Sequence, residues 1–585
     1  MSERVIPGVN VTVVKDVVVP QLSPAGVLGV VGLVEDASKG VQRAASWRRF
    51  VQTFGPGSAH SMPQARAALE NGVTEVVVVP VSSGVAAQAT AVLPLTGSDG
   101  GAELLSLRAR APGSWANNAR VVVSRRARKR DGAVVAFDLE VLCDGQKAGE
   151  GEAFQNLQVL PGFSRSVADV LAARSAVLQL DIGASLTLEA AETPRSGLDE
   201  GEVQVLLRTS SGAPALQIRA SEAVEVSLIE LTPKVGVFQL TVNRPGEGAI
   251  ELPRDTFNLR AGPLLTLDTN TPQGCPDAAA LWETLDALNV LEPELLLWPD
   301  EQPDNRVTLV GGRDATAQEY INALDALVDE PDVDLVCAAL QLPAPASEKD
   351  PAIEANQRKA RQVYAAIISH CELMAAQSKG RRGFGHVPPG VDTEAAVELS
   401  DSLVSDRFVL ASPWGTVGAL AGRVGSLPYF QSPTMKTLAV PTDPKPRHGQ
   451  EDQKALLTGR LVPVAQERGR GVVVIKGITT DGEQLSVRRV ADRAARGVQH
   501  IGELFIGKLN NADSRAALRQ KLGEFLYQMQ NDGAIVPSAD GKLPAFQLDV
   551  YSSQDDFSKG IVRVDLAVRP VRAIDYIYAT LLVQV

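Results

Sequence analysis

The glycines of the stretch GVLGVVG are the first residues whose type and spacing could serve chemistry, because glycine-rich turns bind phosphate groups. Gly26, Gly29 and Gly32 recur every three residues, which is not the G-x-G-x-x-G order of a dinucleotide-binding turn. The sequence also contains no Walker A motif, H-E-x-x-H, G-x-S-x-G or C-x-x-C. We therefore expect small residues in a buried strand here, and we predict no catalytic residue, metal ligand or cofactor.

The histidines and cysteines are too scattered to suggest a metal site or a disulfide framework. His370 and Cys371 are adjacent, late in a long predicted helix. A metal or redox role stays open for this pair, but a packed position is the favoured interpretation. The full sets are His60, His370, His386, His448 and His500, and Cys143, Cys275, Cys337 and Cys371.

The densest basic cluster is RRARKR, residues 125–130. It lies between two strand-like runs and precedes Asp131 and Gly132, a pair typical of hairpin turns. Nucleic-acid binding is the alternative, but no aromatic residues interleave and the surrounding chain is acidic. We expect a solvated hairpin tip and no nucleic-acid partner.

A second basic group recurs at helical spacing and consists of Arg488, Arg489, Arg493 and Arg496. These side chains form either a solvated face or a docking face for an acidic partner, and docking is the favoured interpretation. From residue 457 onward the chain has 17 Lys or Arg and 14 Asp or Glu, a net charge of +3. The preceding 456 residues must then carry −15 to give the total of −12, which suggests two surfaces with different partners.

Composition places the chain among large globular proteins. Its 585 residues exceed one hydrophobic core, so three or four domains are expected. Hydrophobic residues make up 44% and charged residues 22%. The first ten residues show no secretory signal, and no apolar stretch approaches the length of a membrane span. We expect a soluble protein from a reducing compartment, with no direct membrane insertion.

Both chain ends alternate like half-buried strands. Such terminal strands invite pairing with another chain unless charges or prolines protect their edges. We therefore predict that both ends are arms for inter-subunit pairing. Their apolar faces consist of Val5, Pro7, Val9, Val11 and Val13, and of Ile577, Ala579, Leu581, Val583 and Val585.

The pattern between the arms predicts an α/β core, a mixed sheet with flanking helices, that is interrupted by a mostly β insertion. An α+β C-terminal domain that carries the second arm follows. The predicted division is residues 1–20, an N-terminal β arm; 21–100, the first part of an outer α/β domain; 101–274, the inserted outer β domain or domains; 275–445, the second part of the α/β domain; and 446–585, an inner C-terminal domain with its arm at about 573–585.

Several motifs, taken in order, resemble the tail sheath proteins of contractile phage tails and contractile injection systems. They are PGVNV at 7–11, SWRRFVQTFG at 46–55, ALENGVTEVVVVPV at 68–81, ARAPGSWANNARVVVS at 109–124 and AGRVGSLPYFQSPTM at 421–435. The most extensive match runs from residue 506 to 584.

The resemblance implies a structural subunit rather than an enzyme. Sheath subunits stack as rings or a helix around an inner tube, and their arms add strands to a neighbour's C-terminal sheet. It implies a homo-oligomer that also meets the tube, baseplate and terminator or cap proteins, within a virion tail or a particle assembled in the bacterial cytoplasm. Contraction would drive the tube through a target membrane.

The basic C-terminal segment would face the tube in such a sheath. The candidate tube-facing residues are Arg488, Arg489, Arg493, Arg496, Arg515 and Arg519. Two alternatives remain open: another self-assembling shell or tube protein, and, with less support, a nucleotide-binding α/β enzyme.

Overall fold

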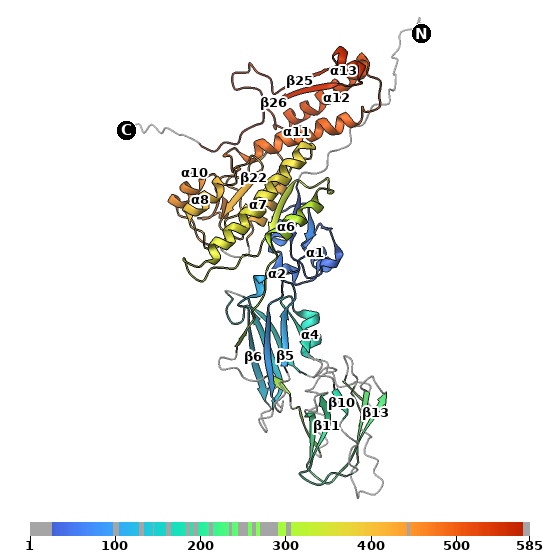
Figure 1. Ribbon diagram of the computed structural model, residues 1–585. Coiled ribbons are helices and arrows are strands. Elements are labelled where there is room, and N and C mark those ends of the chain that lie inside the picture. The colour runs from blue at the N-terminus through green and yellow to red at the C-terminus, as the bar shows by residue number, and fades with distance from the viewer. Residues whose placement is uncertain are drawn as a thin grey trace, which may run out of the picture.

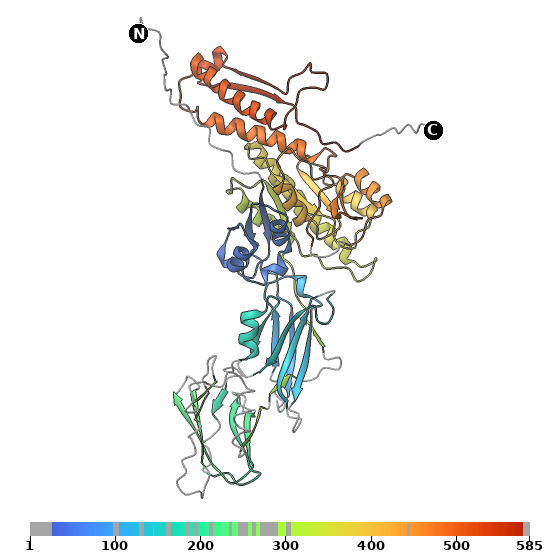
Figure 2. The ribbon, with the colours of Figure 1, turned by 180° about the vertical axis from the view of Figure 1, so that it is seen from behind.

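The computed structural model describes residues 26–576, with gaps at 97–103, 128–133, 144–145, 160–164, 183–187, 191–196, 210–213, 233–236, 244–255, 260–264, 269–290, 296, 300–305 and 441–444. The apolar faces predicted for the two arms, at residues 5–13 and 577–585, lie outside the described residues. Figures 1 and 2 show an elongated molecule, with the C-terminal domain at one end and β sheets at the other.

An eight-stranded sheet forms the centre of the molecule, in the order β2-β3-β1-β20-β21-β22-β23-β24. The six strands from β3 to β23 are parallel, and β2 and β24 are antiparallel at the two ends. This mixed sheet confirms the predicted α/β core. The strands are β1 (Val27–Gly32), β2 (Gln42–Ala44), β3 (Glu75–Pro80), β20 (Leu335–Ala339), β21 (Arg382–His386), β22 (Phe408–Ser412), β23 (Val462–Glu467) and β24 (Gly471–Val474).

Helices cover both faces of this sheet, so its strands are apolar on both sides. Within β1, Leu28 and Val30 pack on one layer of helices, whereas Val27 and Val31 pack on the other. The first layer contains α1 (Trp47–Phe54), α3 (Pro63–Glu70) and α9 (Val417–Ser426). The second contains α6 (Ala317–Leu324), α7 (Ala352–Ala376), α8 (Thr393–Asp401) and α10 (Gln450–Thr458).

The glycines of β1 are packing residues, as expected. A Cβ atom on Gly32 would lie 2.8 Å from the Cβ of Ala339 and from the Cε of Met62. Gly29 is equally enclosed, by Leu327 and Val333. These glycines therefore let neighbouring elements approach the strand closely.

Between β3 and β20 the described chain is mostly β. Two four-stranded sheets share one core that includes Leu105, Val121 and Phe137. They consist of β4 (Thr90–Thr96), β5 (Leu104–Ala109), β9 (Leu178–Ile182) and β18 (Trp298–Pro299), and of β6 (Arg120–Ala127), β7 (Val134–Leu142), β8 (Glu152–Leu157) and β19 (Arg306–Thr308), with α4 (Val167–Arg174) beside them. Strands β6 and β7 pair antiparallel, as expected for a hairpin, but Arg125 and Arg126 lie within β6 rather than at its tip. The rest of the predicted tip lies outside the described residues.

Two further four-stranded sheets lie at the end of the molecule away from the C-terminal domain (Figure 1). One contains β10 (Leu188–Ala190), β11 (Val203–Thr209), β12 (Pro214–Ala220) and β17 (Leu291–Leu295). The other contains β13 (Glu225–Thr232), β14 (Val237–Asn243), β15 (Thr256–Leu259) and β16 (Leu265–Asp268). Strands β18 and β19 come after these two sheets in the chain but belong to the first pair of sheets. The two further sheets are therefore an insertion within the sequence of the first pair.

The C-terminal domain stacks two helices and a two-stranded sheet. Its elements are α11 (Leu485–Glu503), α12 (Ala512–Asn531), β25 (Phe546–Tyr551), α13 (Gln554–Ser558) and β26 (Arg563–Val568). The predicted helical stripe is confirmed, because Leu518, Leu522, Leu526 and Met529 are buried and Phe525 is partly buried. Among the described residues, no helix has the length and apolar character needed to cross a membrane.

The contact between α3 and α9 gives a test of this packing. A Cβ on Gly422 of α9 would lie 2.4 Å from the backbone oxygen of Ala68. We expect Gly422→Ala to lower the free energy of unfolding by about 1–3 kcal/mol, because neither backbone can yield. Gly523 of α12 is a matched control, with no atom within 4 Å of the added Cβ. Gly523→Ala should raise stability by about 0.5–1 kcal/mol. Urea unfolding measures both changes, and equal effects would contradict the packing.

Candidate assembly site

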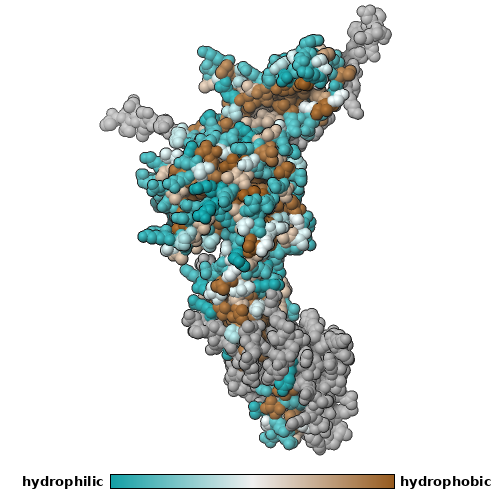
Figure 3. All heavy atoms as spheres, in the orientation of Figure 1, coloured by the Kyte–Doolittle hydropathy of each residue, from teal (hydrophilic) through white to brown (hydrophobic). Residues whose placement is uncertain are grey.

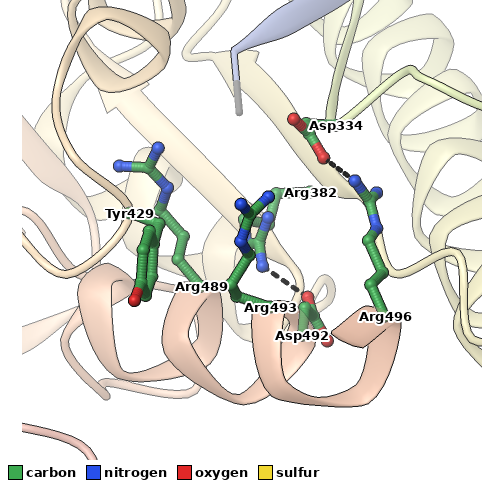
Figure 4. A pocket seen from close by; sticks show the side chains of 7 residues that line it. All are labelled: Asp334, Arg382, Tyr429, Arg489, Asp492, Arg493 and Arg496. Atoms are coloured by element: carbon green, nitrogen blue, oxygen red, sulfur yellow. Dashed lines mark hydrogen bonds and ion pairs between the residues drawn. The ribbon is translucent and has the colours of Figure 1, made fainter. Parts of the chain in front are cut away.

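Helix α11 presents a row of arginines to the amino ends of β20, β21 and β22 in the central sheet. Arg489, Arg493 and Arg496 follow one another at spacings of four and three residues, which places them along one side of the helix. In Figure 4, Arg489, Arg493 and Arg496 extend from the helix, and Arg496 is joined to Asp334. We call the whole cluster the arginine junction; it consists of Arg381, Arg382, Arg407, Arg488, Arg489, Arg493 and Arg496 with Asp334, Asp406 and Asp492.

Asp492 is the centre of the arginine junction. Its buried carboxylate accepts two hydrogen bonds of 3.0 Å from Arg407 and a further one from Arg382. Burial alone would raise the pKa of Asp492, but the charges of Arg382 and Arg407 outweigh burial and hold the pKa below its ordinary value. Arg382 is the first residue of β21, and Arg407 directly precedes β22. Their bonds to Asp492 therefore join α11 to the central sheet.

Asp334 anchors the other end of the helix. Its carboxylate pairs with Arg496, and its second oxygen accepts the backbone N–H of Gly26 at 2.8 Å. Arg496 also donates to the carbonyl of Gly380 at 2.7 Å. The start of β1, the start of β20 and α11 are thereby held together.

The remaining arginines of α11 also have partners in the same chain. Arg489 is buried and donates to the carbonyls of Leu427 and Pro428 at 3.1 and 3.3 Å. Arg488 pairs with Asp406 at 2.8 Å, and the guanidinium of Arg493 lies 5.6 Å from the ring centre of Tyr429.

Two of these arginines, Arg488 and Arg496, pair with carboxylates of the same chain. Helical spacing predicted that Arg488, Arg489, Arg493 and Arg496 share a face, and they do. It did not reveal that the facing aspartates come from residues 334 and 406 and from α11 itself. Arg489 is buried, and Arg496 pairs with Asp334 within the chain.

Arg515 and Arg519, the other two tube-facing candidates, lie on α12. The half-buried Arg515 donates to the side-chain oxygen of Asn510 at 2.8 Å. The Arg519 side chain is 59% exposed and lies 3.7 Å from Asp549. Of the six candidates, Arg519 is the most accessible.

The sheet of the C-terminal domain has only two strands among the described residues. β25 pairs with β26 in antiparallel register from Phe546 and Val568 to Tyr551 and Arg563. Alternate residues such as Leu548 and Val564 pack against the helices, and the other face is exposed and polar. A two-stranded sheet is marginal alone and keeps outer backbone edges that can accept further strands.

The chain that follows β26 is clamped to the loop before α11. Arg572 makes two hydrogen bonds to the carboxylate of Glu483, at 2.7 and 3.1 Å. The amide of Gln484 bonds the backbone of Ala573 in both directions and also bonds Asp575. Directly beyond this clamp, 68% of Tyr576 is exposed. No motif in the sequence singled out Glu483 or Gln484, because their partners lie about ninety residues away.

A hollow at the carboxyl ends of β20 and β22 is where ligands bind in many α/β folds. It is lined by Trp115, Trp414, Gln341 and His60, among others, and its described lining includes no carboxylate, lysine or arginine. Burial lowers the pKa of His60. This lining has no charged group for phosphate binding, and neutral His60 is its only titratable side chain.

His370 and Cys371 occupy packed positions in α7. The ring of His370 lies 2.8 Å from a nitrogen of Arg381, and burial together with that charge lowers the pKa of His370 to about 4. Burial raises the pKa of the Cys371 thiol to about 12. Within the described part of the chain, no group of histidines, cysteines and carboxylates is placed to hold a metal ion.

The arginine junction can be tested by neutralising its central carboxylate. Asp492→Asn leaves Arg382 and Arg407 buried without a charged partner, which should cost about 3–5 kcal/mol of unfolding free energy. Asp549→Asn, whose side chain is 63% exposed, is the matched control and should cost less than about 1 kcal/mol.

Acid provides a second measure of the same pair. Because the pKa of Asp492 is depressed, its stabilisation is present above the ordinary aspartate value of about 4 and is lost as the pH falls through the folded-state pKa. The difference in unfolding free energy between the native chain and Asp492→Asn should therefore shrink as the pH falls. A gap that is independent of pH would refute the charge pairing.

Comparison with known proteins identifies the C-terminal domain. Residues 479–584 match the family model described as the phage tail sheath C-terminal domain. The chain has no significant match among curated protein sequences.

Solved structures give weaker likenesses. The sheath tail protein of Listeria innocua is 13% identical over 94% of this chain and 93% of its own, with a TM-score of 0.41. That of Desulfitobacterium hafniense is 13% identical over 96% and 100%, with a TM-score of 0.42. The contracted helical sheath of the anti-feeding prophage is 18% identical over 49% and 77%, with a TM-score of 0.34.

The family match falls on the segment that forms α11, α12 and the two-stranded sheet. The predicted resemblance to tail sheath proteins is therefore confirmed by the match of residues 479–584 to the phage tail sheath C-terminal domain.

Proposed function

We propose that this chain is the sheath subunit of a contractile tail or injection system. The observation that carries the proposal is the family match over a domain whose sheet, among the described residues, has two strands and open edges. Subunits polymerise around an inner tube as stacked rings or a helix, and contraction drives the tube through a target membrane. The subunit is a structural protein rather than an enzyme, which accords with the uncharged lining of the hollow beside β20.

Strand exchange links the subunits in this proposal. Arms at residues 1–20 and at about 573–585 add strands to the β25–β26 sheet of neighbouring subunits. The clamp by Glu483 and Gln484 supports this role, because it fixes the point from which the second arm leaves. Figure 3 shows apolar side chains gathered in a band across the C-terminal domain, as suits a surface that another chain covers.

In the domain division proposed from the sequence, residues 446–585 form the inner domain that faces the tube. The domains within residues 21–445 lie on the outer side of the sheath. The partners are further copies of this chain, the tube protein, the baseplate and the terminator or cap proteins. The particle is a virion tail or an injection particle assembled in the bacterial cytoplasm. Another self-assembling shell remains the alternative, and electron microscopy separates the two, since closed shells would oppose a sheath.

Arm exchange predicts that truncation abolishes polymerisation without unfolding the subunit. Removal of residues 1–15 or of 576–585 should leave circular dichroism and thermal unfolding of the core intact but yield no long sheaths. Sedimentation and electron microscopy measure the outcome. Truncated chains that still form sheaths would rule out the exchange.

Point substitutions sharpen the same test because the second arm has two faces. Leu581→Asp puts a charge on the apolar face and should prevent polymer formation, whereas Thr580→Asp on the mixed face should be tolerated. Equal effects of the two charges would argue against a buried apolar face.

Tube docking is best tested at Arg519, the most exposed of the candidates. Arg519→Glu should weaken co-assembly with a tube more than sheath self-assembly, because it reverses a charge on the proposed inner domain. Arg174→Glu on α4, an exposed arginine of a proposed outer domain, is the control and should change neither. Co-sedimentation with tube quantifies the effect, and parallel loss of both assemblies would remove Arg519 from the tube contact.

A further inference from the structure

A narrow pocket lies inside the arginine junction, between α11 and the central sheet (Figure 4). Its lining carries more positive than negative charge, since four arginines face two aspartates. The lining consists of Asp334, Arg382, Tyr429, Arg489, Asp492, Arg493 and Arg496. Excess buried charge of one sign is costly unless a counter-charge is present.

The two carboxylates of the pocket are already occupied. Asp492 receives Arg382 on one oxygen and shares both oxygens with Arg407. Asp334 holds Arg496 on one oxygen and the N–H of Gly26 on the other. Neither aspartate contributes a carboxylate oxygen to Arg489.

Arg489 is thus a buried cation with only carbonyl partners among the described residues. Its side chain bonds the oxygens of Leu427 and Pro428, and 4% of the residue is exposed. Burial and the neighbouring charge of Arg382 lower the pKa of Arg489 to about 9. The surroundings therefore disfavour the positive charge that this arginine carries at neutral pH.

Arg382 supplies a second incomplete group. It is 3% exposed, and its Nε has no hydrogen-bond partner among the described residues. A buried donor without a partner costs about 1–3 kcal/mol, more for a charged group. Within the described chain, Arg382 thus lacks one acceptor, and Arg489 has carbonyl partners but no carboxylate partner.

We propose that this pocket binds a chloride-sized inorganic anion, held by Arg489 and Arg382. The pocket admits a body about the size of one water molecule, which selects a monoatomic anion over larger oxyanions. Bound there, the anion offsets the excess positive charge and fastens α11 to the sheet. The inference does not depend on the sheath function.

Stability at constant ionic strength tests the site. For the full-length subunit, sodium gluconate is replaced stepwise by sodium chloride. Chloride should raise the melting temperature along a saturating curve, as expected for a ligand that binds only the folded state. An identical melting temperature in both salts would overturn the proposal.

Variants locate the effect. Arg489→Met keeps an unbranched side chain but removes the charge. The apparent chloride Kd should rise about tenfold or more, because the variant loses one charge-assisted hydrogen bond to the anion. Arg519→Met, on the exposed face of α12, is the matched control and should keep the native chloride curve. An unchanged curve in Arg489→Met would refute the assignment.

Bromide gives a readout that requires no variant. Crystals of the native chain soaked in sodium bromide should show an anomalous peak beside Arg489 and Arg382. Bromide peaks confined to the outer surface would overturn the site.

Discussion

The buried carboxylate of Asp492 is the constraint on which the rest of the subunit depends. It holds Arg382 and Arg407, so α11 cannot leave the central sheet without exposing or orphaning three charges. Such a contact is costly to form and more costly to break. A junction of this kind favours movement of the C-terminal domain and the α/β domain as one body, which a sheath that transmits force would need.

The C-terminal sheet contrasts with this closed junction. Its inner face is covered by α12 and α11, whereas its two strands keep outer backbone edges within the described chain. The clamp at Glu483 and Gln484 lies where the chain leaves this domain. Charge pairing thus holds the inside of the chain together, whereas the outer edges of β25 and β26 have no further strand within the described chain, as the proposed strand exchange requires.

Sequence patterns predicted elements well and partners poorly. The strand GVLGVVG and the stripe from Leu518 to Met529 follow from local spacing, and both have the predicted burial. The helical spacing of Arg489 and Arg496 likewise predicted a shared face. What that face meets was not predictable, because Asp334 and Leu427 are far from it in the chain and only the folded arrangement brings them near.

By itself, the sequence determined the α/β core, the β-rich segment that interrupts it, the C-terminal helices and the likeness to tail sheath proteins. These depend on periodicity, turn residues and motif order, which are local properties. The tertiary structure alone decided that Arg488 and Arg496 pair with the chain's own aspartates and that Arg489 bonds backbone carbonyls instead. It also placed Glu483 beside Arg572. Ion pairing depends on distance in space, and no local pattern records which distant residues folding brings together.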